Sequence, residues 1–403
     1  MLPLTRRAFL ELTGLAALSW PVQAARLPSN ERRRARDLGV RIGRHAPGKW
    51  NAITDVPGVE VGHVTLIEGR GALEVGKGPI RTGVTAIWPQ RSIHTRYLPC
   101  GIDVPNGNGE MSGLLQARNL GVLCSPICLT NTSNVGIVYD ALIDLLPHDA
   151  AAAVVPIVGE TWDAFLNDIE GRHVHAEHVR QALDAARSGP VAEGCVGGGT
   201  GMTCYDFKGG MGTASRQVTS GATAYTVGAL VQANHGVREQ LRIDGVPVGE
   251  EIADLRPVPD DVSYVNSILM ILATDAPLLS HDLDRIARRA VHGLAKTGSV
   301  SGNSSGDIAL AFSTGNPIER DAFWNGDGYA LGGIQQSDMQ PLFEAAAEAV
   351  EEAVINALFM ATDMDGCDDH RVYALPIPRT LEIMRRHRRL FAPAPASSGS
   401  VDA

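Results

Sequence analysis

The chain has 403 residues with a hydrophobic content of 44%, so it can bury a large core in one or two domains. Its formal net charge of -10 at pH 7 argues against a nucleic-acid partner, because phosphate binding needs clustered Lys and Arg. With 44 glycines and only 5% aromatic residues, the composition favours a sheet-rich fold in which backbones approach closely.

The first 24 residues predict an export signal. Arg6 and Arg7 precede the apolar stretch Leu15–Trp20, and Val22-Gln23-Ala24 has the small-residue pattern of a cleavage site, as in a twin-arginine signal peptide. We therefore expect removal of residues 1–24 and a periplasmic location. No later segment is apolar enough, over roughly 20 residues, to span a bilayer, so no membrane contact is expected after removal of the signal.

The six cysteines predict neither a disulfide framework nor a metal site. A chain of this size does not need disulfides, and twin-arginine substrates usually fold in a reducing cytoplasm. Cys124 and Cys128 are not accompanied by a histidine pair at ligand spacing. We therefore expect free, buried thiols and no metal or other cofactor.

The N-terminal half contains several predicted strands and helices. Asn51–Val64 alternates apolar residues around a Pro-Gly turn, which predicts two strands, and Arg81–Trp88 predicts a further strand. Apolar spacing predicts helices over Thr161–Ile169 and Glu177–Arg187. Thr223–Ala233 is typical of a strand, which makes this half a mixture of helices and strands.

Glycines are concentrated in two runs, Gly197–Gly201 and Gly209–Gly212. The runs lack the Lys-Ser/Thr ending of a phosphate-binding loop and the spacing of a dinucleotide fingerprint. We interpret them as turns and close backbone contacts. The charged, turn-rich segment 237–265 then predicts a surface loop.

A strand, a helix and a second strand follow in direct succession. The apolar run Ile268–Ala273 after Ser267 is typical of a strand buried on both faces. Spacings of three and four residues predict an amphipathic helix over Leu283–Leu294, and Ile308–Ser313 predicts the second strand. A long helix and a disordered tail are expected after it, at Gln340–Ala361 and 393–403.

This arrangement predicts a cluster of polar side chains at one edge of a sheet. Two strands joined by a helix run parallel if they share a sheet, so both begin at the same edge. Ser267 opens the first strand, and Ser305 and Asp307 lie at the start of the second. Because side chains alternate, Ser305 and Asp307 should project to one face. We expect these two hydroxyls and one carboxylate to converge.

The dipeptide Asn266-Ser267 is a candidate for self-cleavage. The loop before it is exposed, whereas Ser267 lies on a rigid strand, as a positioned nucleophile requires. The other Asn-Ser dipeptide, Asn303-Ser304, does not open a strand. Attack of the Ser267 hydroxyl on the Asn266 carbonyl would give an ester that water hydrolyses. The freed α-amine, with an ordinary pKa of about 7.7 to 8.0, could deprotonate the adjacent hydroxyl without a histidine. The pattern alone also fits turn or capping residues.

Several ordered blocks resemble the DmpA-like family of L-aminopeptidase/D-esterase and β-aminopeptidase enzymes. The blocks that carry the resemblance, within a match from Asn51 to about Pro376, are Asn51–Val59, Leu129–Thr132, Gly199–Met202, Phe207–Gly210, Val231–Asn234, Asn266–Ile268, Ala273–Leu278 and Ser301–Ile308. The resemblance implies an α/β fold, a four-layer α-β-β-α sandwich of the type shared with ornithine acetyltransferases. It also implies an autoprocessed serine hydrolase whose fragments, 25–266 and 267–403, form one catalytic domain. Such αβ pairs would assemble into a homo-oligomer, commonly of four pairs.

The resemblance also implies roles for individual residues. Carried over by position, Ser267 is the nucleophile, Ser305 and Asp307 orient its amine and hydroxyl, and Asn234 donates to the oxyanion. The family also uses Glu at the place of Asp307. The family's cut often follows Gly, whereas here it would follow Asn266.

Glu160 and Trp162 are candidate substrate-binding residues. An acidic group is needed for the substrate ammonium, and Glu160 could supply it; the alternative is a carboxylate on a helix surface. Some family members carry Tyr where this chain has Trp162, so a hydroxyl that could contact the oxyanion or the substrate is absent here. Trp162 could line the pocket or pack as an aromatic residue on a core helix.

The leading functional hypothesis is release of the N-terminal residue from a short peptide, amide or ester through an acyl-enzyme on Ser267. One alternative is acyl transfer, as in ornithine acetyltransferases, which needs an acyl-enzyme shielded from water. Another is a non-catalytic periplasmic binding protein whose processing machinery has decayed. The presence of Ser267, Ser305 and Asp307 favours an enzyme.

Overall fold

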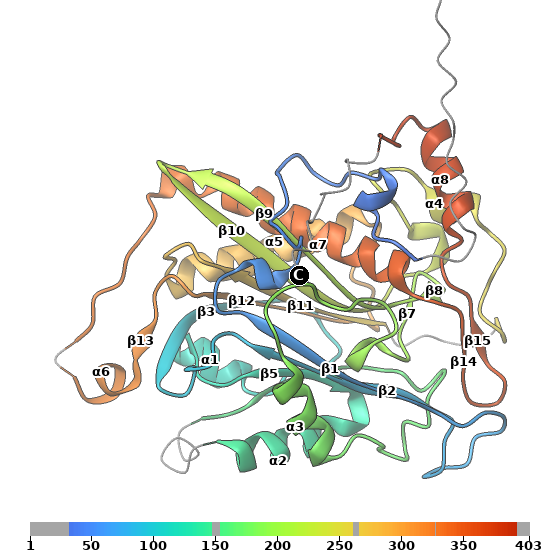
Figure 1. Ribbon diagram of the computed structural model, residues 1–403, viewed down its shortest axis with the longest axis horizontal. Coiled ribbons are helices and arrows are strands. Elements are labelled where there is room, and N and C mark those ends of the chain that lie inside the picture. Colours follow the sequence, from blue (N-terminus) through green and yellow to red (C-terminus); the bar gives the residue numbers. More distant parts are fainter. Residues whose placement is uncertain (1–31, 147–153, 261–265, 327, 393–403) are drawn as a thin grey trace, which may run out of the picture. The chain divides into compact units, whose positions relative to one another are not determined.

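The computed structural model describes residues 32–146, 154–260, 266–326 and 328–392. The predicted signal peptide, residues 1–24, and the predicted tail, residues 393–403, lie outside the described residues. The described chain forms two main sheets that face each other, and each sheet carries helices on its outer face (Figure 1).

The smaller sheet has four strands in the order β1-β2-β5-β6. Their bounds are Glu60–Glu68, Ile80–Trp88, Ile127–Asn131 and Ile157–Thr161. β5 and β6 are parallel, and the other neighbours are antiparallel. Helices α2 (Val135–Leu145) and α3 (Ala176–Ala185) bury their apolar faces against its outer side.

The larger sheet has seven strands, in the order β13-β3-β12-β11-β10-β9 with β4 paired to β3. Their bounds are β3 Arg96–Gly107, β4 Val122–Leu123, β9 Gly210–Ser220, β10 Thr223–Asn234, β11 Ser267–Thr274, β12 Gly306–Ser313 and β13 Ile318–Glu319. Helices α5 (Ser280–Lys296) and α7 (Gln340–Met360) cover its outer side. The predicted strand-helix-strand unit is therefore confirmed, with β11 and β12 parallel.

Strand β11 lies between the two cores and is buried along its whole length. Ile268, Met270 and Leu272 pack toward α5 and α7, whereas Leu269 and Ile271 pack toward the smaller sheet. An apolar residue at every position is what burial on both faces requires. The layers are helices, sheet, sheet and helices, so the predicted α-β-β-α sandwich is confirmed.

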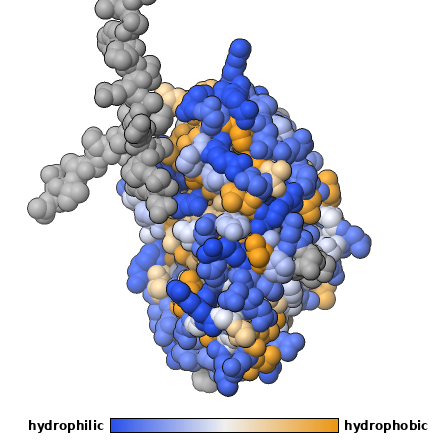
Figure 2. Space-filling view, turned by 90° about the vertical axis from the view of Figure 1, so that its right-hand side faces the viewer, coloured by the Kyte–Doolittle hydropathy of each residue, from blue (hydrophilic) through white to orange (hydrophobic). Residues whose placement is uncertain are grey.

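The remaining elements connect and cap these layers. The short helices and strands are α1 Leu114–Leu120, α4 Val248–Glu251, α6 Arg320–Asn325, α8 Ile377–Arg386, β7 Thr203–Cys204, β8 Phe207–Lys208, β14 Met364–Asp365 and β15 Arg371–Val372. The 3-10 turns are Arg36–Leu38, Ile53–Asp55, Thr132–Asn134, Gly197–Gly199, Arg238–Gln240 and Gln336–Asp338. None of the described helices combines the length and apolar character that crossing a bilayer requires. On the face that Figure 2 shows, hydrophobic residues are scattered among hydrophilic ones.

Three predicted elements are wrong. The segment 237–265, expected as a surface loop, contains the 3-10 turn Arg238–Gln240 and α4 in its described part, 237–260, and buries Leu241, Ile243 and Ile252 in the core. The segment before the Pro-Gly turn is a 3-10 turn rather than a strand, because the Asp55 carboxylate accepts the Ala52 N–H at 3.1 Å and closes the backbone. The helix expected over Thr161–Ile169 is absent. Asn167 Nδ2 donates to Asp163 at 3.0 Å, and Asn167 Oδ1 accepts the backbone N–H of Arg81 at 2.8 Å. The bond to Arg81, which is 86 residues away, ties the segment to β2, and the segment forms turns after β6.

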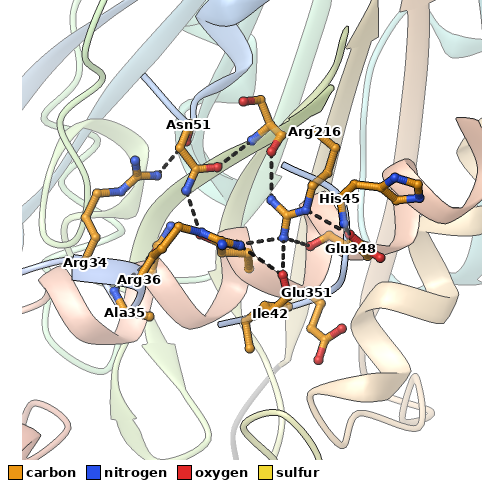
Figure 3. Close-up of polar contacts among 12 residues, drawn as sticks. Arg34, Ala35, Arg36, Ile42, His45, Asn51, Arg216, Glu348 and Glu351 are labelled. Carbon is orange, nitrogen blue, oxygen red and sulfur yellow. Dashed lines mark hydrogen bonds and ion pairs between the residues drawn. The ribbon is translucent and has the colours of Figure 1, made fainter. Parts of the chain in front are cut away.

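A buried ionic network ties α7 to strand β9 and to the N-terminal segment (Figure 3). Arg216 on β9 donates to Glu348 at 3.0 Å and to Glu352 at 2.7 Å. Arg36 and Asn51 both donate to Glu352, each at 2.6 Å. Although burial raises the pKa of Glu352, the charges of Arg216 and Arg36 hold that pKa below its ordinary value. The network therefore joins residues before and after the predicted cleavage point.

Candidate active site

Ser267 is the first residue of β11 and lies between two neighbouring strands. It pairs with Asn234 at the end of antiparallel β10 and with Gly306 at the start of parallel β12. Its exposure is 2%. Because directly paired residues point to the same face of a sheet, Ser267 and Asn234 both face the smaller sheet. The position of the predicted nucleophile is thus fixed by two strand pairings.

The peptide bond before Ser267 lies within reach of the Ser267 hydroxyl. Ser267 Oγ donates to the carbonyl oxygen of Asn266 at 2.6 Å. The backbone N–H of Gly306 donates to the same oxygen at 3.1 Å and contacts Ser267 Oγ at 3.3 Å. The hydroxyl therefore lies beside the carbonyl group, and the Gly306 N–H is a donor to the oxygen that would gain charge in an attack on this bond.

Ser305 and Asp307 form the predicted pair on one face of the chain. The Ser305 hydroxyl donates to Asp307 Oδ1, and both side chains are buried. Burial raises the pKa of Asp307, and hydrogen bonds from the hydroxyls of Ser301 and Ser305 partly offset that rise. A buried carboxylate of this kind favours a positive charge nearby.

The expected convergence with the Ser267 hydroxyl is only partial. Gly306, which separates Ser305 from Asp307, is the residue that pairs with Ser267, so alternation turns the Ser305–Asp307 pair to the opposite face. Among the described residues no hydrogen bond joins Ser267 Oγ to either side chain. In the uncut chain the hydroxyl donates to the Asn266 carbonyl instead.

Asn234 presents an oriented amide beside Ser267. Its Oδ1 accepts the backbone N–H of Thr203 at 2.8 Å, and its Nδ2 donates to the carbonyl oxygen of Trp162 at 2.9 Å. Because only the oxygen can accept the Thr203 N–H, this bond determines which end of the amide faces the smaller sheet. The amide donor is therefore held on the face where the Ser267 hydroxyl lies.

Glu160 reaches the same region from the smaller sheet. It lies on β6 with 5% exposure, which corrects the alternative of a helix-surface carboxylate. Its oxygens accept the Glu110 N–H at 2.9 Å and the Thr132 hydroxyl. A Cβ added at Gly109 would lie 3.3 Å from Glu160 Oε1 and 3.0 Å from the Cα of Gly306, so Gly109 lies close both to the carboxylate and to the residue that pairs with Ser267.

The charge state of Glu160 is set by opposing effects. Burial raises the pKa of Glu160, whereas the hydrogen bonds from Thr132 and from the Glu110 backbone lower it. A buried carboxylate that keeps hydrogen-bond donors can remain charged and pair with an ammonium group. Trp162 follows β6 and packs against a small cluster formed by Phe165, Leu166, Met364 and Val372, so it is not on a core helix. That Trp162 lines a substrate pocket stays a prediction.

The chain matches a known peptidase family along most of its length. The sequence model of Peptidase family S58 matches residues 51–372, a range that includes Glu160, Asn234, Ser267, Ser305 and Asp307. The chain belongs to peptidase family S58.

Relatives of this S58 member include enzymes with solved structures. It is 42% identical to beta-peptidyl aminopeptidase BapA of Sphingosinicella xenopeptidilytica, over 95% of this chain and 96% of that protein. A Burkholderia sp. beta-aminopeptidase structure is 49% identical, with a TM-score of 0.79 over 88% of this chain and 99% of that one. The L-aminopeptidase D-Ala-esterase/amidase of Ochrobactrum anthropi, described as a prototype for serine aminopeptidases and a new variant of the Ntn hydrolase fold, is 42% identical, with a TM-score of 0.82 over 89% and 99% of the two chains.

The glycine-dense stretch of this S58 member serves close packing, as interpreted from the sequence. A Cβ at Gly198 would lie 2.1 Å from Gln232 Oε1, and one at Gly201 would lie 2.3 Å from the Arg81 carbonyl oxygen. Lys208 is fully buried and donates to the Met202 carbonyl at 2.6 Å.

All six cysteines are free thiols. Within the described ranges no three potential metal ligands gather in one place.

Sequence reasoning missed the backbone and side-chain groups that orient the predicted site residues. Gly306, Thr203 and Thr132 each hold a predicted site residue, by the bonds described above. Their roles depend on strand register, which the local pattern does not encode. One sequence pattern draws attention to Gln232. It lies two residues before Asn234 in a predicted strand, so the two side-chain amides share a face.

Proposed function

We propose that this S58 member is a self-cleaving serine aminopeptidase that releases the N-terminal residue of short peptides, amides or esters through an acyl-enzyme on Ser267. The observation that carries the proposal is the contact of Ser267 Oγ with the Asn266 carbonyl oxygen at 2.6 Å, with the Gly306 N–H donating to the same oxygen. The names of the relatives support the class of reaction.

Self-cleavage follows from that geometry. Ser267 Oγ attacks the carbonyl carbon of Asn266, and the Gly306 N–H stabilises the charge on the oxygen. The C–N bond then breaks as the hydroxyl proton passes to the nitrogen of Ser267, which becomes an α-amine. Water hydrolyses the resulting ester to the Asn266 carboxylate and the free Ser267 hydroxyl. The products are fragments 25–266 and 267–403.

Turnover reuses the same hydroxyl. The Ser267 α-amine accepts the proton of its own hydroxyl, and Oγ attacks the scissile carbonyl of the substrate. The Asn234 amide donates to the oxyanion, and the leaving amine departs with the proton. Water then releases the acyl group. The buried pair of Ser305 and Asp307 stabilises the charged amine, so this mechanism needs no histidine.

Glu160 is proposed to bind the substrate ammonium. Glu160→Gln should raise KM for a substrate with a free N-terminal amine by about 10- to 100-fold, because a charge-assisted hydrogen bond worth about 1.5 to 3 kcal/mol is lost. Self-cleavage should continue, since no ammonium takes part in it. Steady-state kinetics on a free-amine p-nitroanilide measures the change. The control is Glu177→Gln, an exposed carboxylate on α3 at the outer side of the smaller sheet, and its KM should stay unchanged. A Glu160→Gln enzyme with an unchanged KM would contradict the assignment.

Export and assembly are also proposed. The sequence pattern of residues 1–24 supports twin-arginine export to the periplasm.

A homo-oligomer of αβ pairs is supported by exposed aromatic residues on the arm around α6, which extends away from the sheets (Figure 1). Trp324 and Tyr329 on this arm are each 47% exposed. Light scattering should give about 160 kDa for four pairs of about 40 kDa each. A mass of one pair would exclude the oligomer.

A further inference from the structure

Strand β10 carries two side-chain amides that cross from the larger sheet to the smaller one. Gln232 and Asn234 are two residues apart and therefore share a face. Gln232 Nε2 donates to the Thr130 carbonyl and to Thr161 Oγ1, both at 2.8 Å. Asn234 Nδ2 donates to the Trp162 carbonyl at 2.9 Å. The end of β6 is thus attached to β10 by both amides.

The orientation of Gln232 is determined by its partners. The Thr130 carbonyl can only accept a hydrogen bond, so the nitrogen of the amide must face it. The side chain is fully buried, and its Oε1 has no hydrogen-bond partner among the described residues. An unsatisfied buried acceptor costs about 1 to 3 kcal/mol. A residue kept at that cost indicates a role other than stability.

The bonds of Gln232 connect the two halves of the proposed site. Thr130 pairs with Glu160 between β5 and β6, and Thr161 is the next residue after Glu160. On its own sheet Gln232 pairs with Leu269, two residues after Ser267. Gln232 therefore links the strand of the proposed ammonium site to the strand of the proposed nucleophile, through atoms that do not react.

Asn234 is less suited to hold this distance during turnover. Its amide is proposed to donate to the oxyanion, so its bond to the Trp162 carbonyl competes with its function. The two bonds of Gln232 involve only the Thr130 carbonyl and the Thr161 hydroxyl, and these can persist through every step of the reaction.

We propose that Gln232 is a positioning residue that fixes Glu160 relative to Ser267 and thereby determines how strongly the enzyme selects substrates with a free N-terminal amine. The proposal rests on the proposed roles of Ser267 and Glu160. Self-cleavage does not require Gln232, because Ser267 pairs with Gly306, the Asn266 carbonyl accepts the Gly306 N–H, and that reaction binds no ammonium.

The test compares two substrates in the Gln232→Met enzyme. Methionine keeps the length of the side chain but removes both donors. Against a free-amine aminoacyl p-nitrophenyl ester, kcat/KM should fall about tenfold or more, mainly through KM, because misplacement by 1 Å can cost about 100-fold. Against an ester of a simple carboxylic acid, which has no amine, kcat/KM should stay unchanged. Complete self-cleavage shows that the variant is folded.

Two further variants separate positioning from stability. Thr274→Val removes two buried hydrogen bonds at the opposite end of β11, at 2.8 Å to the Thr226 carbonyl and 3.2 Å from the Ala276 N–H. The ratio of kcat/KM for the free-amine ester to kcat/KM for the amine-free ester should not change in this variant. Thr161→Val removes one acceptor of Gln232, so it should lower the ratio less than Gln232→Met and add little when the two changes are combined.

The possible results distinguish this inference from the proposed function. If Glu160→Gln lowers the ratio and Gln232→Met does not, Gln232 has no positioning role and the inference is wrong. An equal loss of activity on both esters in the Gln232→Met enzyme would also contradict the inference. If Glu160→Gln itself leaves the ratio unchanged, the ammonium site assigned to Glu160 fails instead, and the inference fails with it.

Discussion

The Ser267→Ala protein should remain one chain of about 40 kDa after signal removal, and its aminopeptidase activity should be lost. The unaltered protein should give pieces of about 26 and about 15 kDa, from scaling 42.7 kDa over 403 residues by fragment length. Removal of the Oγ atom removes the group that lies 2.6 Å from the Asn266 carbonyl oxygen. Loss of a serine nucleophile lowers kcat by a factor on the order of 10⁶ in a comparable hydrolase.

Denaturing mass analysis and N-terminal sequencing check both parts of this result. The smaller piece should begin Ser-Ile-Leu-Met, residues 267–270. Ser304→Ala is the matched control, because Asn303-Ser304 is the other Asn-Ser dipeptide and lies in an exposed turn rather than at the start of a strand. That control should be cut normally. Peptide hydrolysis by a preparation in which the Asn266–Ser267 bond is intact would refute the mechanism.

The predictable part of the site is the part that local periodicity encodes. The buried strand after Ser267, the amphipathic helix and the second strand follow from apolar spacing within about 50 residues. Their parallel pairing follows from the helical connection. The same reasoning placed Ser305 and Asp307 together, as the structure has them. It did not give the register of β11 on β12, which turns that pair away from the face of the Ser267 hydroxyl.

The part that could not be predicted depends on distant partners. Trp162, Phe165 and Leu166 have helical spacing, yet they pack in a small core with Met364 and Val372 from the C-terminal region. No local pattern shows that a segment about 200 residues away will cover these side chains. The position of Glu160 on a strand was missed for the same reason. The resemblance proposed Asn234, and the need for an acidic group proposed Glu160, but the bonds that orient these two side chains are seen only in the structure.

Arg216→Met should destabilise the protein by about 3 to 5 kcal/mol, because it leaves two carboxylates buried without their main counter-charge. Arg216 is fully buried and contacts Glu348 and Glu352 of α7. After cleavage at Asn266–Ser267, β9 and α7 would lie on different fragments, so these contacts would help the pairing of β10 with β11 and of β3 with β12 to hold the fragments together. Urea denaturation followed by size separation should show a lower midpoint and separated fragments.

Combining Arg216→Met with Ser267→Ala isolates the role of the network in holding the fragments. In the uncut chain the same loss of stability is expected, but the chain cannot dissociate and should refold when urea is removed. Arg379→Met is the control for the charge change, since Arg379 pairs with Asp254 at the surface, and its midpoint should move little. If Arg216→Met left the midpoint of the cut protein unchanged, strand pairing and the packing of α7 on β9 would hold the fragments together without a contribution from the ionic network.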